Sequence, residues 1–392
     1  MRSTNETGCK TEHCDDTSAL STPVTWGPTA GGRLCAFYQP ILDSRTLQIV
    51  SAEALVRLVG PDGRIYSPAQ FLPEDNDEAL RQVTQFMLET APRAIGRLDA
   101  EGFVLGVSIN VVPRLLAEPI CRQHFREILD GCPLPLTRLT LELLESSDFL
   151  NRDGAVRILH DMTKTGVRLA LDDLGTGYSS LARLRDLPIR EMKLDFSFVR
   201  ELPRKPADLH FLIVLKELAE RLHCDFVAEG VETLEILDAM LVLRVPFLQG
   251  FAIAQPMSFS KLREFLHVHD KGFDAPRPGT LGVYACVLCH DRHLRRIIEQ
   301  QPMIIANSRV FDVRTCPVDR QIRVAGLSGS PLDHLHRRYH VLLAQCAERH
   351  ALRGRYDGQE LDSVQTNMEE WLASKMLDKI MVSTVNASHR NF

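Results

Sequence analysis

From residue 33 to residue 268 the sequence alternates short apolar runs with longer amphipathic stretches. Short apolar runs bounded by turn residues are typical of buried strands, and apolar residues recurring every three or four positions are typical of helices. The runs that predict strands are 34–41, 47–57, 103–110, 138–144, 167–173, 189–195, 225–229 and 245–249. The stretches that predict helices are 75–99, 113–130, 152–165, 179–186, 206–223 and 233–243. This repetition predicts an α/β fold, a (β/α)8 TIM-like barrel, with an open doubly wound sheet as the alternative.

The first two predicted strands depart from the regular barrel pattern. Only the turn Asp43-Ser44-Arg45-Thr46 separates them. Parallel strands need a crossover of a dozen or more residues, whereas a hairpin needs only a short turn. We therefore expect the first strand to run antiparallel to the second.

The two ends of the chain have a different pattern from the middle. Residues 1–32 are polar and rich in Ser, Thr, Asp, Gly and Pro, which predicts a disordered N-terminal tail. Gly, Pro and charged residues concentrate again in 269–280, which predicts a linker after a barrel over 33–268. In 281–392 the strand signal fades and apolar residues recur at helical spacing, which predicts a small all-α helical bundle as a second domain.

Composition narrows the class of protein. The chain has 392 residues, 44% hydrophobic and 25% charged, which indicates a folded protein. Its formal net charge of −5 argues against a general binder of nucleic acid. We expect a cytoplasmic protein without membrane insertion, because no apolar run approaches a spanning helix and no signal peptide is visible. The ten Cys would then stay reduced, as buried residues, reactive thiols or metal ligands.

Polar residues stand at or near the carboxyl ends of the predicted strands. They are Asn110, Glu142, Asp172, Asp173, Lys193, Glu229 and Gln249, with Glu53 inside the second strand. Each alone would be explained as a helix cap or a solvated loop residue. In a barrel, however, the carboxyl ends of the strands meet on one face, where active sites are built. Converging carboxylates repel one another and favour hard divalent cations such as Mg²⁺ or Mn²⁺, with two ions suited to phosphoryl displacement.

The full set of motifs resembles the EAL-domain family, the metal-dependent phosphodiesterases of cyclic di-GMP, over residues 34–268. The motifs stand in the family's order: Tyr38-Gln-Pro40, Glu53-Ala-Leu-Val-Arg57, Asn110-Val-Val-Pro113, Glu142-Leu-Leu-Glu145-Ser, Asp172-Asp-Leu-Gly-Thr-Gly-Tyr-Ser-Ser180, Lys193-Leu-Asp195, Glu229-Gly-Val-Glu232-Thr and Gln249-Gly250. The naming tripeptide alone carries little information, whereas the ordered set is specific.

The resemblance implies a role for each of these residues. One Mg²⁺ or Mn²⁺ would be held by Glu53, Asn110, Glu142 and Asp172, and a second by Asp172, Asp173 and Glu229. Lys193 would position or activate the hydrolytic water, with Gln249 beside it. Gln39 and Arg57 would contact the substrate, Arg57 through a phosphate that suits its guanidinium fork. Glu145 and Glu232 would support the loop after Asp173, which tunes metal binding and a homodimer.

The implied reaction opens one phosphodiester bond of cyclic di-GMP and gives linear pGpG. Three positions depart from the family pattern: Leu58, Val112 and Leu174 stand where Trp, Ser and Phe are common. None of the three is an implied ligand or the Lys, so the chemistry is expected to remain. A catalytically silent receptor of cyclic di-GMP is the alternative, because retained ligands must also be correctly placed.

The C-terminal part carries a separate set of potential ligands. His336 and His340 are four residues apart on one predicted helix, so both rings can face the same way. With His293 and Cys316 they form a set suited to tetrahedral Zn²⁺, and the alternative is that the paired His are solvated. The order resembles the chemoreceptor zinc-binding (CZB) domain over 281–392, although Pro317 follows the Cys where that family has Gly and Trp nearby.

The string Cys286-Val-Leu-Cys289-His290 matches the attachment pattern of c-type haem. Haem attachment occurs outside the cytoplasm, and aliphatic residues separate the two thiols. We therefore predict structural or redox-sensitive thiols, which could also serve as alternative zinc ligands.

Together these features predict a two-domain signalling enzyme. The barrel would hydrolyse cyclic di-GMP with two Mg²⁺ or Mn²⁺ ions. A CZB-like domain would bind Zn²⁺ and regulate the barrel within a homodimer. The alternatives are the silent receptor and a zinc or redox sensor that acts through protein partners.

Overall fold

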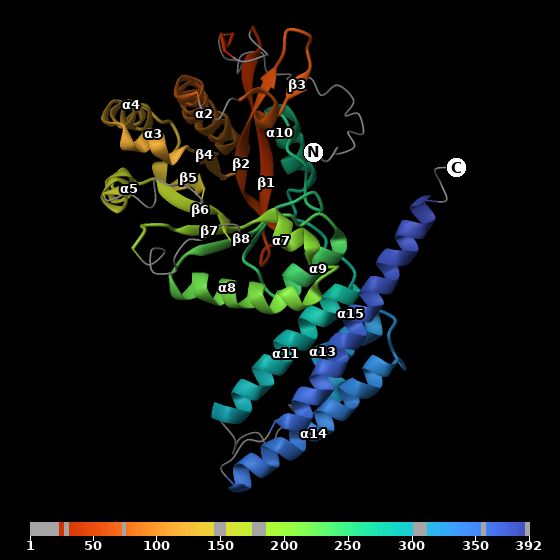
Figure 1. The fold of residues 1–392 in the computed structure, drawn as a ribbon. Coiled ribbons are helices and arrows are strands. Elements are labelled where there is room, and N and C mark those ends of the chain that lie inside the picture. The colour runs from red at the N-terminus through yellow and green to blue at the C-terminus, as the bar shows by residue number, and fades with distance from the viewer. Residues whose placement is uncertain are drawn as a thin grey trace.

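The computed structural model describes residues 23–26, 31–72, 76–144, 154–174, 186–300, 312–353 and 358–388 (Figure 1). Almost all of the predicted tail, residues 1–32, lies outside these ranges, as does the predicted helix at 179–186. Within the described residues, no helix has both the length and the apolar character needed to cross a bilayer.

Eight strands close into a barrel, as predicted, rather than forming an open sheet. They are β1 (Arg33–Asp43), β2 (Gln48–Val59), β4 (Gly106–Asn110), β5 (Leu139–Leu144), β6 (Arg168–Leu174), β7 (Glu191–Leu194), β8 (Asp225–Ala228) and β9 (Phe247–Leu248). The barrel closes because β1 pairs with both β2 and β9, antiparallel in each case. The other neighbouring pairs are parallel, so the predicted hairpin departure is confirmed. The short strand β3 (Ile65–Tyr66) pairs with the outer part of β2.

Helices surround the barrel on its outside (Figure 1). They are α1 (Pro68–Phe71), α2 (Asp77–Leu98), α3 (Pro113–Ala117), α4 (Pro119–Asp130), α5 (Ala155–Thr163), α7 (Phe196–Glu201), α8 (Leu209–Arg221), α9 (Leu234–Val242) and α10 (Phe259–Val268), with 3-10 turns η2 (Asp99–Glu101), η3 (Leu136–Arg138) and η5 (Pro206–Asp208). Side-chain caps begin α2 and α9, because Asn76 accepts from Ala79 N–H and Thr233 accepts from Ile236 N–H. Helix α10 was not expected from the apolar pattern.

Helical structure continues beyond residue 280. The elements are α11 (Thr280–Gln300), η7 (Val313–Thr315), α13 (Pro317–Val324), α14 (Pro331–Arg353) and α15 (Gln359–Ser388). We call α11, α13, α14 and α15 the C-terminal helices. Figure 1 shows them leading away from the barrel, with α11 starting beside α9 and α15 as the longest. No strand occurs among the described residues after 280, and their separation as an independent domain stays a prediction.

Buried apolar residues form one continuous core from the barrel into the C-terminal helices. Strand residues such as Leu141 and Phe226 belong to it, and so do Leu288 on α11 and Leu372 on α15. The C-terminal helices therefore pack against the barrel through apolar contacts.

Candidate functional site

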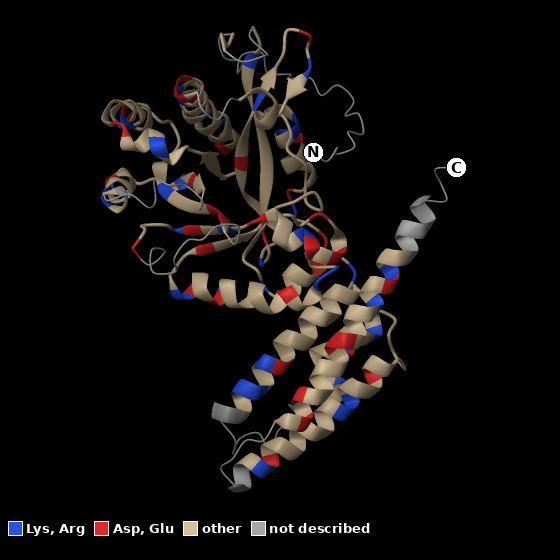
Figure 2. Ribbon diagram, in the orientation of Figure 1, with Lys and Arg blue, Asp and Glu red and all other residues tan. Residues whose placement is uncertain are grey.

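The carboxylates at the strand ends converge on the ammonium group of Lys193. This side chain is fully buried, with 0% of its surface exposed. Its Nζ lies 2.6 Å from Glu229, 2.9 Å from Glu142, 3.2 Å from Glu53 and 3.6 Å from Asp172. Glu53 lies on β2, Glu142 on β5 and Asp172 on β6. Glu229 is the residue directly after β8. Figure 2 shows the acidic residues on the barrel strands as well as on the outer helices.

Amide side chains hold Glu53 in place from both sides. Asn110 donates from Nδ2 to Glu53 Oε1 over 2.8 Å, and Gln249 donates from Nε2 to Glu53 Oε2 over 2.7 Å. Gln249 also donates to Gln39 Oε1 at 3.2 Å, and Gln39 donates to the Ala254 carbonyl. The strand register explains the convergence, since Glu53 is paired with Gln39 on β1 and Asn110 is paired with Glu142 on β5. Residues that are paired in this way lie at the same level along the barrel axis.

An irregularity in β6 presents two adjacent acids at the site. The register between β6 and β7 shifts between Leu171 and Leu174, and Asp173 has a φ of 58°. Left-handed backbone is uncommon for a residue other than Gly, and strained residues of this kind cluster at active sites. Asp173 is half-buried, and the nearby Asp195 caps α7 by accepting from Ser197 N–H. Asp195 stood in a sequence motif, but its place beside Asp173 was not predicted.

Burial and mutual repulsion raise the pKa of most of these acids. Burial is the largest cause for Glu142 and Asp172, whose pKa values rise, with repulsion from Glu53 added. The pKa of Glu229 rises to about 8 and that of Asp173 to about 6, mainly through burial. Burial also opposes ionisation of Glu53, but Lys193 and the amide hydrogen bonds outweigh it and lower the pKa.

Lys193 is a cation near neutral pH in the metal-free structure. Burial alone would lower its pKa, but the surrounding carboxylates raise it well above the usual value. It therefore cannot accept a proton near neutral pH. Its chemical capacity is to donate hydrogen bonds and to stabilise negative charge.

The residues of this site fit divalent cations. One ammonium group faces four carboxylates, so negative charge is in excess. In the described part of the chain, buried Glu142 Oε1 and Asp172 Oδ1 face Lys193 as ion pairs, and buried Glu142 Oε2 has no hydrogen-bond partner. Unsatisfied buried carboxylate oxygens are costly, and a hard cation with oxygen ligands removes that cost.

Three further residues were expected at this site from the sequence, and the structure gives fewer contacts for them. Arg57 is half-buried on β2, and burial lowers its pKa while Glu53 opposes that effect. Glu232 lies half-buried in the segment that joins β8 to α9. Glu145 lies outside the described residues.

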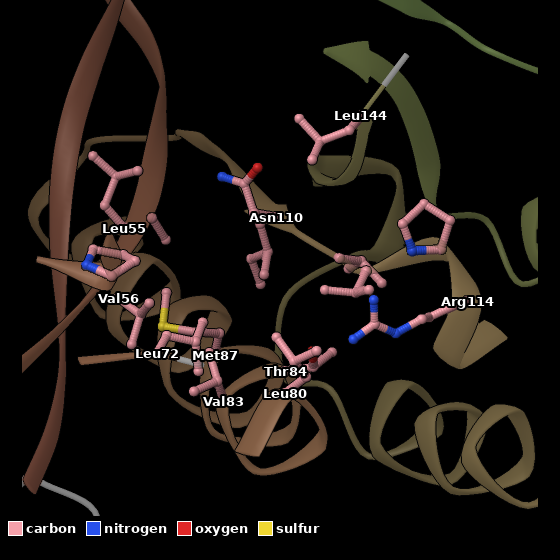
Figure 3. Close-up of a pocket in the computed structure, with 16 residues that line it drawn as sticks. Leu55, Val56, Leu72, Leu80, Val83, Thr84, Met87, Asn110, Arg114 and Leu144 are labelled. Carbon is pink, nitrogen blue, oxygen red and sulfur yellow. The ribbon is translucent and has the colours of Figure 1, made fainter. Parts of the chain in front are cut away.

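A cavity of about 590 Å³ opens beside Asn110. Its walls are mainly apolar and come from β2, α2 and the segment after β4 (Figure 3). Figure 3 shows Asn110 at the edge of this cavity, with Met87 and Val83 on one wall and Arg114 on another. The cavity has the size and lining typical of a small-molecule site.

A second candidate metal centre lies within the C-terminal helices. Cys316 Sγ is 3.0 Å from His290 Nε2 and 3.3 Å from His336 Nε2. Ligand atoms of His290, Cys316 and His340 lie within 4.8 Å of one another, and the rings of His336 and His340 are 4.8 Å apart. We call His290, Cys316, His336 and His340 the His/Cys cluster.

The structure corrects one residue of the predicted set. His293 is exposed and does not lie with the other three, whereas His290 takes that place. The physical reason is the phase of α11, because His290 follows buried Val287 by three residues and precedes buried Leu294 by four. In the sequence, His290 is also part of the haem-like string Cys286-Val-Leu-Cys289-His290. Cys286 and Cys289 lie on the same helix as free thiols, outside the His/Cys cluster.

The His/Cys cluster fits a metal that prefers nitrogen and sulfur ligands. Burial is the largest cause that lowers the pKa of His290 to about 4 and that of His336 to about 3, so both rings are neutral near pH 7. Burial raises the pKa of Cys316 to about 11. Among the described residues, the buried Nδ1 of His336 has no hydrogen-bond partner. Three imidazoles and one thiol are a donor set typical of Zn²⁺.

Comparison with known proteins agrees with the barrel and its motifs. The EAL domain family model matches residues 28–256. Cyclic di-GMP phosphodiesterase NbdA of Pseudomonas aeruginosa is 33% identical over 244 residues, which cover 62% of this chain and 31% of that protein. Probable cyclic di-GMP phosphodiesterase PdeG of Escherichia coli is 31% identical, over 59% of this chain and 46% of that protein.

A solved structure described as PaMucR phosphodiesterase in complex with c-di-GMP is also similar. It has a TM-score of 0.55 and 31% identity, and the match covers 58% of this chain and 94% of that one. The chain spans less than half the length of these two curated relatives, and the matched region ends before the C-terminal helices. The family match covers more than half of the chain, and the chain belongs to the EAL domain family.

Proposed function

We propose that this chain is a metal-dependent phosphodiesterase that hydrolyses cyclic di-GMP to linear pGpG. The observation that carries the proposal is the convergence of Glu53, Glu142, Asp172 and Glu229 on buried Lys193. The family membership and the names of the relatives NbdA and PdeG support it. A receptor that only binds the nucleotide would not need this excess of buried charge, which is costly in the absence of cations.

Two Mg²⁺ or Mn²⁺ ions are the proposed cofactors of the barrel. Glu53, Asn110, Glu142 and Asp172 would hold one ion, and Asp172, Asp173 and Glu229 the other. Such ions supply an activated water and stabilise charge on the phosphoryl oxygens. Lys193 would orient the water and stabilise the developing charge, while Gln249 and Asn110 keep Glu53 aligned.

Substrate would lie across the face formed by the strand ends. We propose that one base of the nucleotide enters the apolar cavity beside Asn110, and that Gln39 and Arg57 contact the substrate, Arg57 through a phosphate. Asn110 at the rim places the apolar cavity next to the acids, so that a base and its phosphate can be bound together.

The C-terminal helices are proposed to be a CZB-like domain that binds Zn²⁺ through the His/Cys cluster and regulates the barrel. Three clustered ligands support this assignment: buried Cys316 before α13, buried His340 on α14 and half-buried His290 on α11. Glu145 and Glu232 are proposed to support the loop after Asp173 within a homodimer, as the family resemblance implies.

The direct test is the purified chain with cyclic di-GMP and Mg²⁺ or Mn²⁺, with pGpG measured by chromatography. Glu53→Ala should abolish turnover, because this carboxylate touches Lys193, Asn110 and Gln249. Glu191→Ala is a matched control, since Glu191 is a buried acid at the opposite end of the barrel. Tight binding without pGpG in either metal would instead support the silent receptor.

A further inference from the structure

Barrel helix α9 and the start of C-terminal helix α11 are in very close contact at Asp238 and Gly282. A Cβ atom on Gly282 would lie 1.7 Å from Asp238 Oδ2, far inside the contact distance of any two atoms. The same Oδ2 accepts a hydrogen bond of 2.8 Å from Gly279 N–H, and Asp238 is buried. Glu235, on the same helix α9, accepts from Leu281 N–H at 3.4 Å. Gly282 is therefore the residue that permits α11 to approach α9 this closely.

The segment before α9 is held equally tightly to the metal-binding face. It runs from Glu229, beside Lys193, to the cap Thr233. Within it, Val231 N–H donates to the Gln249 carbonyl at 3.1 Å. A Cβ atom on Gly250 would lie 2.3 Å from the Val231 carbonyl oxygen. A segment with so little room passes a shift of α9 on to Glu229 and Gln249, because close-packed interiors transmit strain.

Helix α11 also connects the contact at Gly282 to the His/Cys cluster. Gly282 and His290 are both on α11, eight residues apart, which is about 12 Å along a helix. The ligands come from α11, the residue before α13, and α14, so a bound ion would restrain α11 relative to those elements. Asp291, next to His290, also accepts from buried Tyr339 on α14.

Other polar contacts between the C-terminal helices and the barrel are more exposed. Arg292 pairs with Glu217 on α8 at 2.9 Å, with both side chains exposed. His210 on α8 lies 3.1 Å from Glu369 on α15, with half of the His210 side chain exposed. Exposed pairs of this kind transmit little force.

We propose that the contact between Gly282 and Asp238 positions Glu229 and Gln249, and couples them to the His/Cys cluster. Gly282 is the positioning residue, because the close approach of α11 to α9 that it permits sets the place of α9, and Gly282 touches none of the metal ligands of the barrel. The coupling half of this inference rests on the proposed zinc site and the proposed phosphodiesterase site.

The experiment is Gly282→Ala, with Gly96→Ala as the matched control. Gly96 is also helical, and nothing lies within 4 Å of a Cβ placed there. Mn²⁺ affinity is measured by electron paramagnetic resonance on the full chain loaded with one equivalent of Zn²⁺, without nucleotide. We expect Gly282→Ala to weaken Mn²⁺ binding about tenfold and to lower kcat about tenfold or more, with KM nearly unchanged, since misplacing a reacting group by about 1 Å costs about 100-fold. Gly96→Ala should change neither quantity.

A second variant separates positioning from a general loss of stability. Asp238→Ala removes the carboxylate that a Cβ at residue 282 would strike, so the double variant Gly282→Ala with Asp238→Ala should recover most of the Mn²⁺ affinity and kcat. If Gly282→Ala lowers only the unfolding temperature and leaves the Mn²⁺ affinity of the folded protein unchanged, the positioning role is wrong.

The coupling is tested by reciprocity. Mn²⁺ affinity of the unaltered chain should differ at least threefold between the zinc-loaded and zinc-free forms, and Mn²⁺ should change zinc affinity by the same factor. Equal affinities in both forms would overturn the coupling. A lack of turnover in the unaltered chain would instead refute the proposed phosphodiesterase, because the Mn²⁺ measurement involves no substrate.

Discussion

The barrel site and the His/Cys cluster are both buried, but they differ in how charge is arranged. In the barrel, four carboxylates surround one ammonium group, and burial raises the pKa of three of them. In the cluster, burial keeps two imidazoles neutral and raises the pKa of the thiol. The first arrangement has an excess of negative charge and oxygen ligands for hard cations, whereas the second has nearly neutral nitrogen and sulfur ligands for Zn²⁺.

The two sites also differ in how their ligands are placed. Barrel ligands come from neighbouring strands whose register brings them to one level, as with Asn110 and Glu142. Cluster ligands come from separate helices, and the phase of each helix decides which residue points inward. A sequence therefore indicates the first kind of site more readily than the second.

The largest effect is expected from removing the single cation of the barrel. Lys193→Met should lower kcat by about 1000-fold or more, since it removes the group proposed to orient the water. Without divalent ions the variant should also lose about 3–5 kcal/mol of stability, because the buried carboxylates lose their partner. Mn²⁺ should restore the unfolding temperature but not turnover. Lys216→Met on α8 is the control, and turnover above a tenth of the unaltered rate in Lys193→Met would contradict the assigned role.

The next effect concerns the ligands of the His/Cys cluster. His336→Ala should weaken Zn²⁺ binding by more than about 100-fold, since even residues that only support a ligand contribute about 10- to 100-fold. His293→Ala is the matched control, because this His is exposed on the same helix as His290 and should leave zinc affinity unchanged. Competition with a chromophoric chelator measures the zinc affinity of both variants. Loss of zinc in His293→Ala but not in a His290→Ala variant would show that His293, and not His290, is the ligand.

A smaller effect is the pH dependence of the metal-free protein. Burial raises the pKa of Glu229 to about 8, so the folded chain keeps a proton that the unfolded chain loses at lower pH. The free energy of unfolding should therefore fall as pH rises from 6.5 to 8. His290 and His336 partly offset this fall near pH 6.5, because their folded pKa values lie below the unfolded value of 6.5 and the unfolded rings still bind protons there. Thermal unfolding in a chelator should show a decrease of several degrees, and Glu229→Gln should flatten it.

Thermal unfolding with Mn²⁺ gives a second test of this pH dependence. It should stabilise the protein more at pH 8 than at pH 6.5, because binding requires the deprotonated carboxylate. A stability that is constant over this window without metal, or equal stabilisation by Mn²⁺ at both pH values, would contradict the assignment of Glu229 as a ligand.

The smallest effect is expected at the exposed contact between the two regions. Glu217→Ala breaks the pair with Arg292 and should cost no more than about 0.5–1 kcal/mol of stability, because both side chains are exposed. Urea unfolding at low and high salt measures this loss of stability. A larger loss than this would show that the exposed pair, rather than the contact at Gly282, holds the C-terminal helices to the barrel.

Much of the barrel and of its site could be predicted because both depend on local pattern and on strand ends. The apolar runs predicted each strand of the barrel to within a few residues, and Glu53, Glu142, Asp172, Lys193 and Glu229 meet as expected. The backbone of Asp173, with its positive φ, could not be predicted, because it results from a shift in register with β7. The choice of His290 over His293 depended on the packing of α11, which several apolar positions left ambiguous.

The sequence by itself determined the alternation of strands and helices, the hairpin at the start of the barrel and the identity of the acidic residues. Periodicity and turn length are local properties, so they can be read along the chain. Only the tertiary structure decided that Lys193 lies at the centre of the acids, that His290 joins Cys316, and that Gly282 meets Asp238. These are contacts between residues far apart in the sequence, and they depend on how complete elements pack rather than on the pattern within any one of them.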